Sequence, residues 1–358
     1  MLEIDLVHPA DYHVHLRQGE MTAAVTPAVR KGGMSIAYVM PNLTPPVTDI
    51  ERVQKYKAEL QRISPKTTFL MTFYLSKVLT PEVVYKAAKL GAIQGIKCYP
   101  AGVTTNSGAG IDPSDFSRFY PIFKVMQDTG LVLNLHGERP SIQSEGINVI
   151  NAEPKFLPAL FAIHRDFPRL RIVLEHCTTR AAIRAISEIN KDLKKGQIPT
   201  VVGSITAHHL FLTIDDWTGN PVNYCKPVAK FTEDRDALVR AATSGKSYFI
   251  FGSDSAPHEI SKKCTFNKIA AGVYTQPYVL SYLAELFERN GKLDMLKNFV
   301  SKFGSRFYGM DDESKLACKD RCYLVKKPVQ IPEKLCYNGI ELTIFRPCKE
   351  LSWSVEWR

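Results

Sequence analysis

The sequence predicts an α/β protein built as a closed (β/α)₈ barrel, the TIM-barrel class. Eight apolar runs of strand length alternate along the chain with amphipathic stretches of helix length. Most of these runs are apolar on both faces, which is typical of buried parallel strands. The chain has 358 residues, and barrels of alternating strands and helices often reach this length as one unit.

The order of these segments supports the barrel. The expected strands are residues 2–15 (as one strand or two short ones), 35–42, 67–76, 92–100, 131–136, 171–176, 200–209 and 247–254. The expected helices are residues 51–63, 81–91, 114–130, 154–167, 179–193 and 233–245. Thr80 followed by Pro81 is a typical helix start, because threonine caps an N-terminus and proline suits the first turn.

Polar side chains stand at the ends of these strands. In DYHVHLR (11–17), His13, His15 and Arg17 share one strand face, because side chains alternate between faces. Other strands carry Asn42, Lys97, His136, His176 and Asp254 at or near their ends. Barrels of this class form their active site at the C-terminal ends of the strands. One histidine there is unremarkable, but four with a lysine and an aspartate favour a metal site.

The chemistry of this set suits two metal ions. Four imidazoles and one carboxylate exceed the three protein ligands of a usual catalytic zinc, whereas two-metal hydrolytic sites hold ions about 3.5–4 Å apart. Lys97 can supply the bridge, since burial beside dications lowers the pKa of a lysine. A neutral amine can react with CO₂ to give a carbamate with one oxygen for each metal. Without the surrounding ligands, we would interpret Lys97 as a lysine that forms a salt bridge.

Six motifs in order carry a family resemblance. They are DYHVHLR (11–17), MPNLTPPVT (40–48), GIKCYPAGVTTNS (95–107), NLHGE (134–138), LEHCTT (174–179) and FGSDSAPH (251–258). Together they resemble dihydroorotases of the short, single-function bacterial and fungal type in the amidohydrolase superfamily, the fungal enzymes most closely. The resemblance runs from about residue 2 to residue 310. Residues 311–358 read as short strands, similar to the C-terminal extension of the fungal enzymes. We therefore expect a hydrolase barrel over residues 1–310 and a small β-rich extension packed on it.

The resemblance implies a hydrolase of cyclic amides that reversibly cyclises N-carbamoyl-L-aspartate to L-dihydroorotate in pyrimidine (UMP) synthesis. It implies two Zn²⁺ ions per subunit, bridged by carboxylated Lys97. The first zinc would be held by His13, His15, Lys97 and Asp254, and the second by Lys97, His136 and His176. A hydroxide bridging the metals would attack the ring amide carbonyl, with Asp254 as general acid and base. The substrate carboxylate would be held by Arg17, Asn42 and His258, with backbone contacts near Lys226 and Ala271.

The loop after Lys97, GVTTNSGAGID (102–112), is expected to act as a lid. It has three glycines and no apolar anchor, and its position at the catalytic rim places the hydroxyls of Thr104 and Thr105 near the substrate. An ordinary surface loop is the alternative and the commoner role. His208 and His209 close the seventh barrel strand, but the ligand set is complete without them. We interpret these two histidines as supporting or structural residues.

Two other functions remain open. A hydantoinase or dihydropyrimidinase would use the same histidine pair and carboxylated lysine, so the metal motif cannot separate it. The residues implied to hold the substrate carboxylate (the carboxylate clamp: Arg17, Asn42 and His258) separate this function from that of a dihydroorotase. A ring without a carboxylate gives Arg17 nothing to pair with. A catalytically inactive dihydroorotase-like scaffold should have lost ligands, whereas here every expected position is filled.

Amino-acid composition and charge distribution limit the kinds of partner that we expect for this protein. The net charge is +10, but Lys and Arg are spread along the chain without a basic tail, so we expect no nucleic-acid partner. The sequence has no apolar run near 18 residues and no signal-peptide pattern, which favours a cytoplasmic protein without a membrane partner. The eight cysteines fit no common zinc-finger spacing and are expected to be reduced thiols. A homodimer is implied by the resemblance alone.

Overall fold

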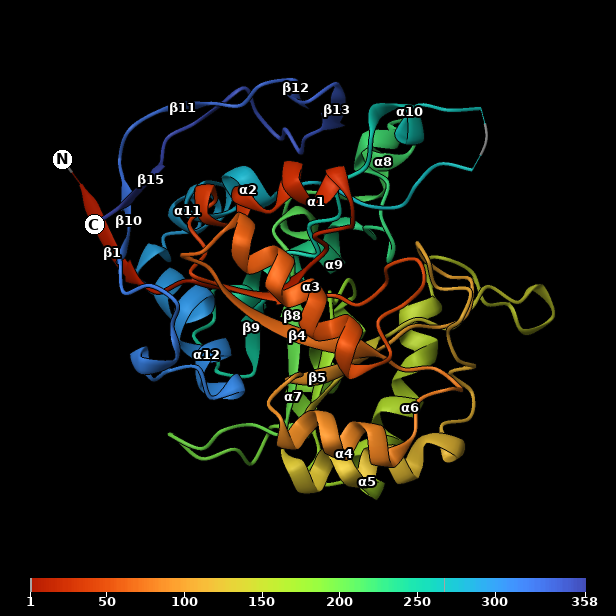
Figure 1. Ribbon diagram of the computed structural model, residues 1–358. Coiled ribbons are helices and arrows are strands. Elements are labelled where there is room, and N and C mark those ends of the chain that lie inside the picture. Colours follow the sequence, from red (N-terminus) through yellow and green to blue (C-terminus); the bar gives the residue numbers. More distant parts are fainter. Residues whose placement is uncertain (1, 267) are drawn as a thin grey trace.

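The main sheet is a barrel of parallel strands in sequential order, β2 to β9 (Figure 1). The structure is a computed structural model that describes residues 2–266 and 268–358. Within these residues the barrel has eight strands: β2 Ala10–Val14, β3 Ile36–Val39, β4 Thr68–Tyr74, β5 Gly95–Cys98, β6 Val132–His136, β7 Arg171–Glu175, β8 Val201–Ile205 and β9 Phe249–Phe251. The predicted (β/α)₈ fold is confirmed.

The barrel closes where the chain leaves β9 and returns to β2. Val14 pairs in parallel with Ser255, and the His15 backbone N–H donates to the Ser255 carbonyl over 3.1 Å. The Asp254 N–H donates to the His13 carbonyl over 2.8 Å. These bonds bring the ends of the first and last barrel strands together, and with them the residues predicted to bind metal.

Helices lie between the strands and surround the barrel (Figure 1). The α-helices are α1 Glu20–Val25, α2 Pro27–Lys31, α3 Ile50–Ile63, α4 Pro81–Lys89, α5 Tyr120–Thr129, α6 Ala152–Asp166, α7 Arg180–Ile189, α8 Ile214–Trp217, α9 Thr232–Ala242, α10 Ile260–Lys263, α11 Val279–Arg289 and α12 Phe303–Tyr308. Short 3₁₀ turns are Ser117–Phe119, Gln143–Glu145, His208–Leu210, Pro221–Asn223, Gln276–Tyr278, Leu293–Met295 and Glu313–Lys315, and Asn298–Lys302 is a π-helical turn. At the start of α4, the Thr80 side chain accepts from the Val83 N–H, as expected of a cap.

One helix begins later than expected. Residues 114–130 were expected to be helical, but α5 starts at Tyr120, after the 3₁₀ turn Ser117–Phe119. The Asp115 carboxylate accepts from the Ser117 N–H, a local bond that competes with helix formation. Pro121 then lies in the first turn of α5, where its missing N–H removes no helical bond.

The seventh barrel strand is shorter than expected. It was predicted over residues 200–209, but β8 ends at Ile205. His208 and His209 therefore lie in the 3₁₀ turn after the strand, and both are buried.

The two ends of the chain meet in a separate antiparallel sheet (Figure 1). β10 (Cys322–Val325) pairs with β1 (Glu3–Val7) on one side and with β15 (Ser354–Trp357) on the other. Residues 2–15 thus form two strands, β1 and β2. The remaining pairs after residue 310 are β11 (Val329–Gln330) with β14 (Glu350–Leu351) and β12 (Lys334–Tyr337) with β13 (Ile340–Thr343). β13 lies beside α10, where Leu342 pairs with Glu259.

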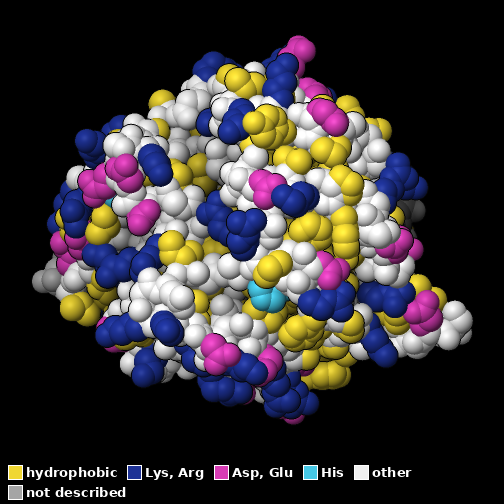
Figure 2. Space-filling model, turned by 90° about the horizontal axis from the view of Figure 1, so that it is seen from below, with side chains coloured by type: hydrophobic (Ala, Val, Ile, Leu, Met, Phe, Trp, Pro, Cys, Tyr) yellow, Lys and Arg dark blue, Asp and Glu magenta, His cyan; other side chains and the backbone are white. Residues whose placement is uncertain are grey.

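The surface carries its positive charge in a dispersed form. Figure 2 shows Lys and Arg side chains scattered between acidic, apolar and uncharged groups on one face. This distribution fits a solvated surface better than a binding stripe for nucleic acid. The eight cysteines lie among the described residues and are free thiols. Of the described helices, none has the length and apolarity needed to cross a membrane.

Candidate active site

His13 and His15 meet Asp254 at the rim of the barrel. The Nε2 atoms of His13 and His15 lie 3.3 and 3.0 Å from the Asp254 Oδ1 atom. All three side chains are buried, and their ligand atoms lie within 4.8 Å of one another. Two imidazoles and a carboxylate in this arrangement form a suitable donor set for a metal ion.

The other predicted ligands lie beside this group. The rings of His136 and His176 have centroids 4.6 Å apart, and the His176 centroid lies 5.2 Å from that of His13. The Lys97 side chain is fully buried on β5. Among the described residues, neither Lys97 Nζ nor His176 Nδ1 has a hydrogen-bond partner. Buried polar atoms are normally paired, so these two atoms are available to bind a ligand at the rim.

In three of the histidines, one ring nitrogen contacts a buried side-chain oxygen. The His13 Nδ1 atom lies 2.8 Å from Glu175 Oε2, and the His136 Nε2 atom lies 2.7 Å from Glu138 Oε2. Asn42 Oδ1 lies 2.8 Å from the Nδ1 atom of His15. An acceptor on one ring nitrogen fixes the tautomer and leaves the lone pair of the other nitrogen for a metal.

Sequence reasoning missed Glu138 and Glu175. Both lie within the quoted motifs, Glu138 two residues after His136 and Glu175 directly before His176. An acidic residue so close to a strand-end histidine was the available signal. The contact between Glu175 and His13, which lie 162 positions apart, could not be predicted from the position of Glu175 beside His176.

Burial sets the protonation state of the rim. It lowers the pKa of His15 to about 4 and that of His136 below its usual range, so these rings are neutral near pH 7. Burial also lowers the pKa of Lys97, although Glu175 and Asp254 act in the opposite direction. Burial opposes ionisation of Asp254, but the His15 hydrogen bond and the charges of the histidines hold its pKa below the usual range.

Strained backbone turns three of these side chains onto the rim. Arg17, His176 and Asp254 have φ values of 60°, 41° and 46°, in the left-handed region that favours glycine. Each such residue costs about 1–3 kcal/mol and is kept only where the surroundings impose it. The surroundings include the Ser204 hydroxyl, which accepts from the His176 N–H over 2.7 Å. Such strain is concentrated at functional sites.

The residues expected to hold a carboxylate share one pocket. A cavity of about 250 Å³ has Arg17, Asn42, Thr105 and His258 in its wall. The Arg17 Nε atom donates to the Pro257 carbonyl over 3.0 Å, and its Nη2 atom lies 3.1 Å from His258 Nε2. Burial and the Arg17 charge lower the pKa of His258, which leaves that ring neutral.

Ala271 joins the same pocket through its backbone. Its carbonyl lies 3.0 Å from His258 Nε2 and accepts from the Thr105 hydroxyl over 3.3 Å. The segment is also tied to the connection that carries Lys226. The Lys263 Nζ atom donates to the Tyr224 carbonyl over 2.7 Å and to the Gly272 carbonyl over 2.8 Å. The Lys226 side chain is not part of the described wall of this pocket.

The loop over residues 102–112 lies against the rim. The Asn42 Nδ2 atom donates to the Thr105 carbonyl over 3.0 Å, and the Asn106 Nδ2 atom donates to the Asn42 carbonyl over 2.9 Å. Thr104 is placed differently, because its backbone bonds to the Ser107 hydroxyl. Thr105 is therefore the loop threonine that reaches the pocket.

The expectation that this loop has no apolar anchor is wrong. Ile111 is buried, with 2% of its surface exposed. Its N–H donates to the Tyr99 carbonyl over 2.9 Å, and its carbonyl accepts from the Ala101 N–H over 3.0 Å. The far end of the loop is thus fixed, and the segment around Thr105 is held by polar contacts.

Similar proteins match this sequence over almost its whole length. The dihydroorotase of Saccharomyces cerevisiae is 56% identical over 360 residues, covering 99% of this chain and 98% of the relative. A probable dihydroorotase of Schizosaccharomyces pombe is 48% identical over 348 residues, covering 97% of each chain. No protein-family model matches the chain.

Solved structures also match the chain over almost its whole length. Dihydroorotase from Saccharomyces cerevisiae, in complex with 5-fluoroorotic acid, matches with a TM-score of 0.98 at 55% identity, covering 100% of this chain and 99% of the other. L-Hydantoinase (dihydropyrimidinase) from Arthrobacter aurescens matches with a TM-score of 0.79 at 14% identity, covering 99% of this chain and 84% of the other, which shows a shared fold alone. Neither the hydantoinase nor the inactive-scaffold alternative is favoured. The chain belongs to the dihydroorotase family, enzymes of the amidohydrolase fold that act on a cyclic amide.

Proposed function

We propose that the chain interconverts N-carbamoyl-L-aspartate and L-dihydroorotate in pyrimidine synthesis, with two Zn²⁺ ions per subunit. The observation that carries this proposal is the position of the carboxylate pocket beside the metal-ligating group. Asn42 belongs to both, since its Oδ1 atom contacts His15 and its Nδ2 atom contacts the Thr105 backbone. The Saccharomyces cerevisiae relative was solved with 5-fluoroorotic acid, a ring that carries a carboxylic acid.

The rim residues fit two metal ions. His13, His15 and Asp254 would hold the first, and His136 and His176 the second, with carboxylated Lys97 between them. The unpartnered Nζ atom of Lys97 and Nδ1 atom of His176 support this fit. The bound ions would polarise the amide carbonyl and lower the pKa of water.

Lys97 is suited to carry the bridging carbamate. Burial lowers its pKa, which favours the neutral amine that can attack CO₂. A new N–C bond forms, the nitrogen loses a proton, and a cationic or neutral side chain becomes an anion. That anion satisfies the charge of two dications better than an ammonium would.

Asp254 would move the proton of the reaction. Its lowered pKa keeps the carboxylate ionised, so it can accept a proton from the attacking water. It would then give this proton to the ring nitrogen as the amide C–N bond breaks. In the direction of synthesis both transfers run in reverse.

The pocket would orient the ring for this attack. Arg17 offers a planar fork that matches a carboxylate, and charged bonds of this kind are stronger than neutral ones. Asn42 and His258 line the same pocket, while the backbone near Ala271 and Lys226 would contact the ring. Thr104 and Thr105 belong to the loop that would close over it.

The test is an ultraviolet assay of dihydroorotate consumption beside hydantoin and dihydrouracil, with metal analysis on the same sample. We expect turnover of dihydroorotate, little turnover of the other two rings, and two zinc ions per chain. Equal turnover of all three rings would contradict the carboxylate clamp, and a chain without metal but with full activity would contradict the metal site.

The remaining proposals concern the whole chain. It would act in the cytoplasm as a homodimer, as its resemblance to the family implies. Residues 1–310 would form the hydrolase barrel, apart from β1, which pairs with β10 of the extension, and residues 311–358 an extension packed on it. Light scattering of the purified protein tests the dimer, and a mass of 40.2 kDa, that of one chain, would contradict it.

A further inference from the structure

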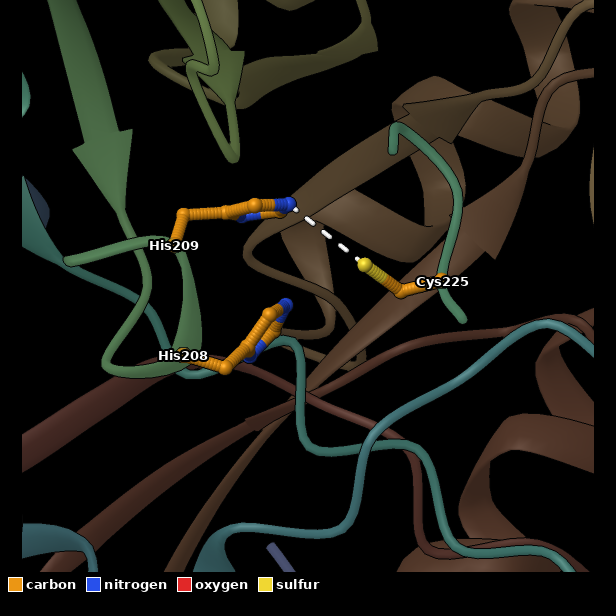
Figure 3. Close-up of side chains that lie close together, drawn as sticks. All are labelled: His208, His209 and Cys225. Atoms are coloured by element: carbon orange, nitrogen blue, oxygen red, sulfur yellow. Dashed lines mark hydrogen bonds between the residues drawn. The ribbon is translucent and has the colours of Figure 1, made fainter. Parts of the chain in front are cut away.

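A second group of metal-ligating side chains lies outside the rim group. Figure 3 shows His208 and His209, from the turn after β8, with Cys225, from the connection before α9, pointing toward one another. One ligand atom of each residue lies within 4.8 Å of the other two. All three residues are buried, with exposures of 0%, 1% and 2%. None of them belongs to the proposed set of rim ligands.

His208 indicates that this group lacks a ligand. Both nitrogens of its fully buried ring are without a hydrogen-bond partner among the described residues. Leaving a buried polar group unpaired costs about 1–3 kcal/mol, and such groups are rare in folded proteins. A neutral imidazole with a free lone pair is a common ligand of divalent metals.

The contacts of His209 allow the tautomer that a metal-binding histidine needs. Its Nδ1 atom lies 2.8 Å from Thr206 Oγ1, and its Nε2 atom lies 3.5 Å from the Cys225 sulfur. When Nδ1–H donates to Thr206, the lone pair of Nε2 faces the sulfur. This support of one nitrogen while the other binds is typical of metal sites.

The Pro227 carbonyl closes the group. Its oxygen lies 3.0 Å from His209 Nε2 and 3.2 Å from the Cys225 sulfur. Without a metal, these two groups can donate their hydrogens to the carbonyl. With a metal, the same oxygen can serve as a fourth ligand, since structural zinc is usually four-coordinate.

We propose that His208, His209 and Cys225 bind a third divalent metal ion of borderline softness, such as Zn²⁺ or Co²⁺. Two imidazoles and a thiolate are the ligand types that these ions prefer over Mg²⁺ or Ca²⁺. The ion would link the turn after β8 to the connection that carries Cys225, and so tie the two segments together.

The Cys225 thiol must lose its proton before it can bind a metal ion. Burial raises the pKa of the Cys225 thiol to about 12, and metal binding must displace this proton. The bond that forms joins sulfur to the metal, and the thiol proton is released to solvent. Affinity should therefore increase with pH. Charged groups that interact with this thiol are Asp254, Lys263, Lys230 and Glu138.

The absorption spectrum of bound Co²⁺ distinguishes the two kinds of site, because the proposed rim ligands are all nitrogen and oxygen atoms, whereas the second group contains a thiolate. A thiolate–cobalt charge-transfer band in the near ultraviolet would report binding at Cys225. We expect wild-type protein loaded with Co²⁺ to hold three ions per chain and to show this band. Cys225→Ser should lose the band and one ion, and His208→Gln should weaken binding of that ion.

Cys264→Ser is the matched control, because Cys264 is an exposed free cysteine that could bind cobalt adventitiously. It should keep the band and three ions. Two ions without a band in the wild type, or a band that survives Cys225→Ser, would overturn the proposal. A metal-dependent rise in melting temperature in wild type and Cys264→Ser, but not in Cys225→Ser, would support it. Dihydroorotate turnover is a separate readout that tests the proposed function alone.

Discussion

Arg17 is the residue that we expect to decide which ring the site accepts. The expectation that it shares one strand face with His13 and His15 is wrong, because β2 ends at Val14. Arg17 lies beyond the strand, and its guanidinium is directed to the Pro257 carbonyl and to His258. A cation is repelled by metal ions, so Arg17 is expected to bind the substrate rather than a metal. Its left-handed backbone, with a φ of 60°, suggests that this direction is imposed by the fold.

Replacing Arg17 should therefore affect one class of ring. A charged hydrogen bond contributes ~1.5–3 kcal/mol, so Arg17→Met should lower kcat/KM for dihydroorotate about 10- to 100-fold. Arg17→Lys should rescue only part, because a point charge lacks the fork. Both variants should keep two metals and their rate on dihydrouracil. Equal losses on the two rings would mean that Arg17 supports the site structurally.

Lys97 provides a test of the carbamate. Lys97→Ala should lose most metal and activity, because the bridging anion disappears from a buried site between two dications. A short carboxylic acid at high concentration should restore part of the activity by taking its place. Metal analysis and turnover with and without the acid check this expectation. An alanine variant with two metals and nearly full turnover would rule out the bridge.

The residues on strand ends could be predicted from the sequence, whereas their partners could not. His13, His136, His176 and Asp254 end or follow apolar strands, and the barrel rule alone brings them to one rim. The bond between His13 and Glu175 depends on how β2 and β7 face each other across the barrel. His176 and Asp254 are residue types that adopt the left-handed conformation more often than most, but nothing in their sequence context shows that they adopt it here.

At the scale of elements, the loop over residues 102–112 is the segment that we propose closes over the site. Its Thr105 hydroxyl donates to the Ala271 carbonyl over 3.3 Å, and Ile111 anchors its far end. The three glycines suggested mobility, but burial of Ile111 depends on tertiary packing and was not evident in the sequence. The loop thus has one end fixed by Ile111 and a polar contact to the pocket through Thr105.

Breaking that polar contact should slow turnover without removing metal. A neutral hydrogen bond contributes ~0.5–1.5 kcal/mol, so Thr105→Ala should lower kcat about 2- to 12-fold. Deletion of residues 108–110 should lower it further, because the segment could no longer reach Ala271. Asp112→Asn is the control, because Asp112 is an exposed residue at the anchored end of the loop and its carboxylate bonds to Ser114, away from the pocket. Unchanged kcat in both Thr105→Ala and the deletion would identify this segment as an ordinary surface loop.

On the scale of the whole molecule, the barrel was predictable and the joining of the chain ends was not. Alternating apolar and amphipathic segments specify sequential parallel strands, because such strands need helical crossovers. β1 has no such constraint, and its partner β10 lies more than 300 residues away along the chain. Nothing local in residues 3–7 shows that they pair with the extension instead of the barrel.

The extension is attached to the barrel helices through Trp353. This side chain is fully buried, its Nε1 atom donates to Glu288 on α11 over 3.0 Å, and the Lys326 ammonium lies 4.8 Å from its ring. Lys326 also pairs with Glu288. Trp353 thus joins α11 to the part of the extension around Lys326, and it lies outside the proposed site.

Trp353→Ala should destabilise the molecule while leaving its chemistry intact. Removing a buried aromatic side chain costs ~3–5 kcal/mol, which for a chain of this size lowers Tm by roughly 4–7 °C. Trp353→Phe should cost less, because it loses the bond to Glu288 but keeps most of the packing. Scanning calorimetry should show one transition in each variant, with normal metal content and kcat at 25 °C. A separate early transition in Trp353→Ala, with the barrel transition unmoved, would instead make residues 311–358 an independent folding unit.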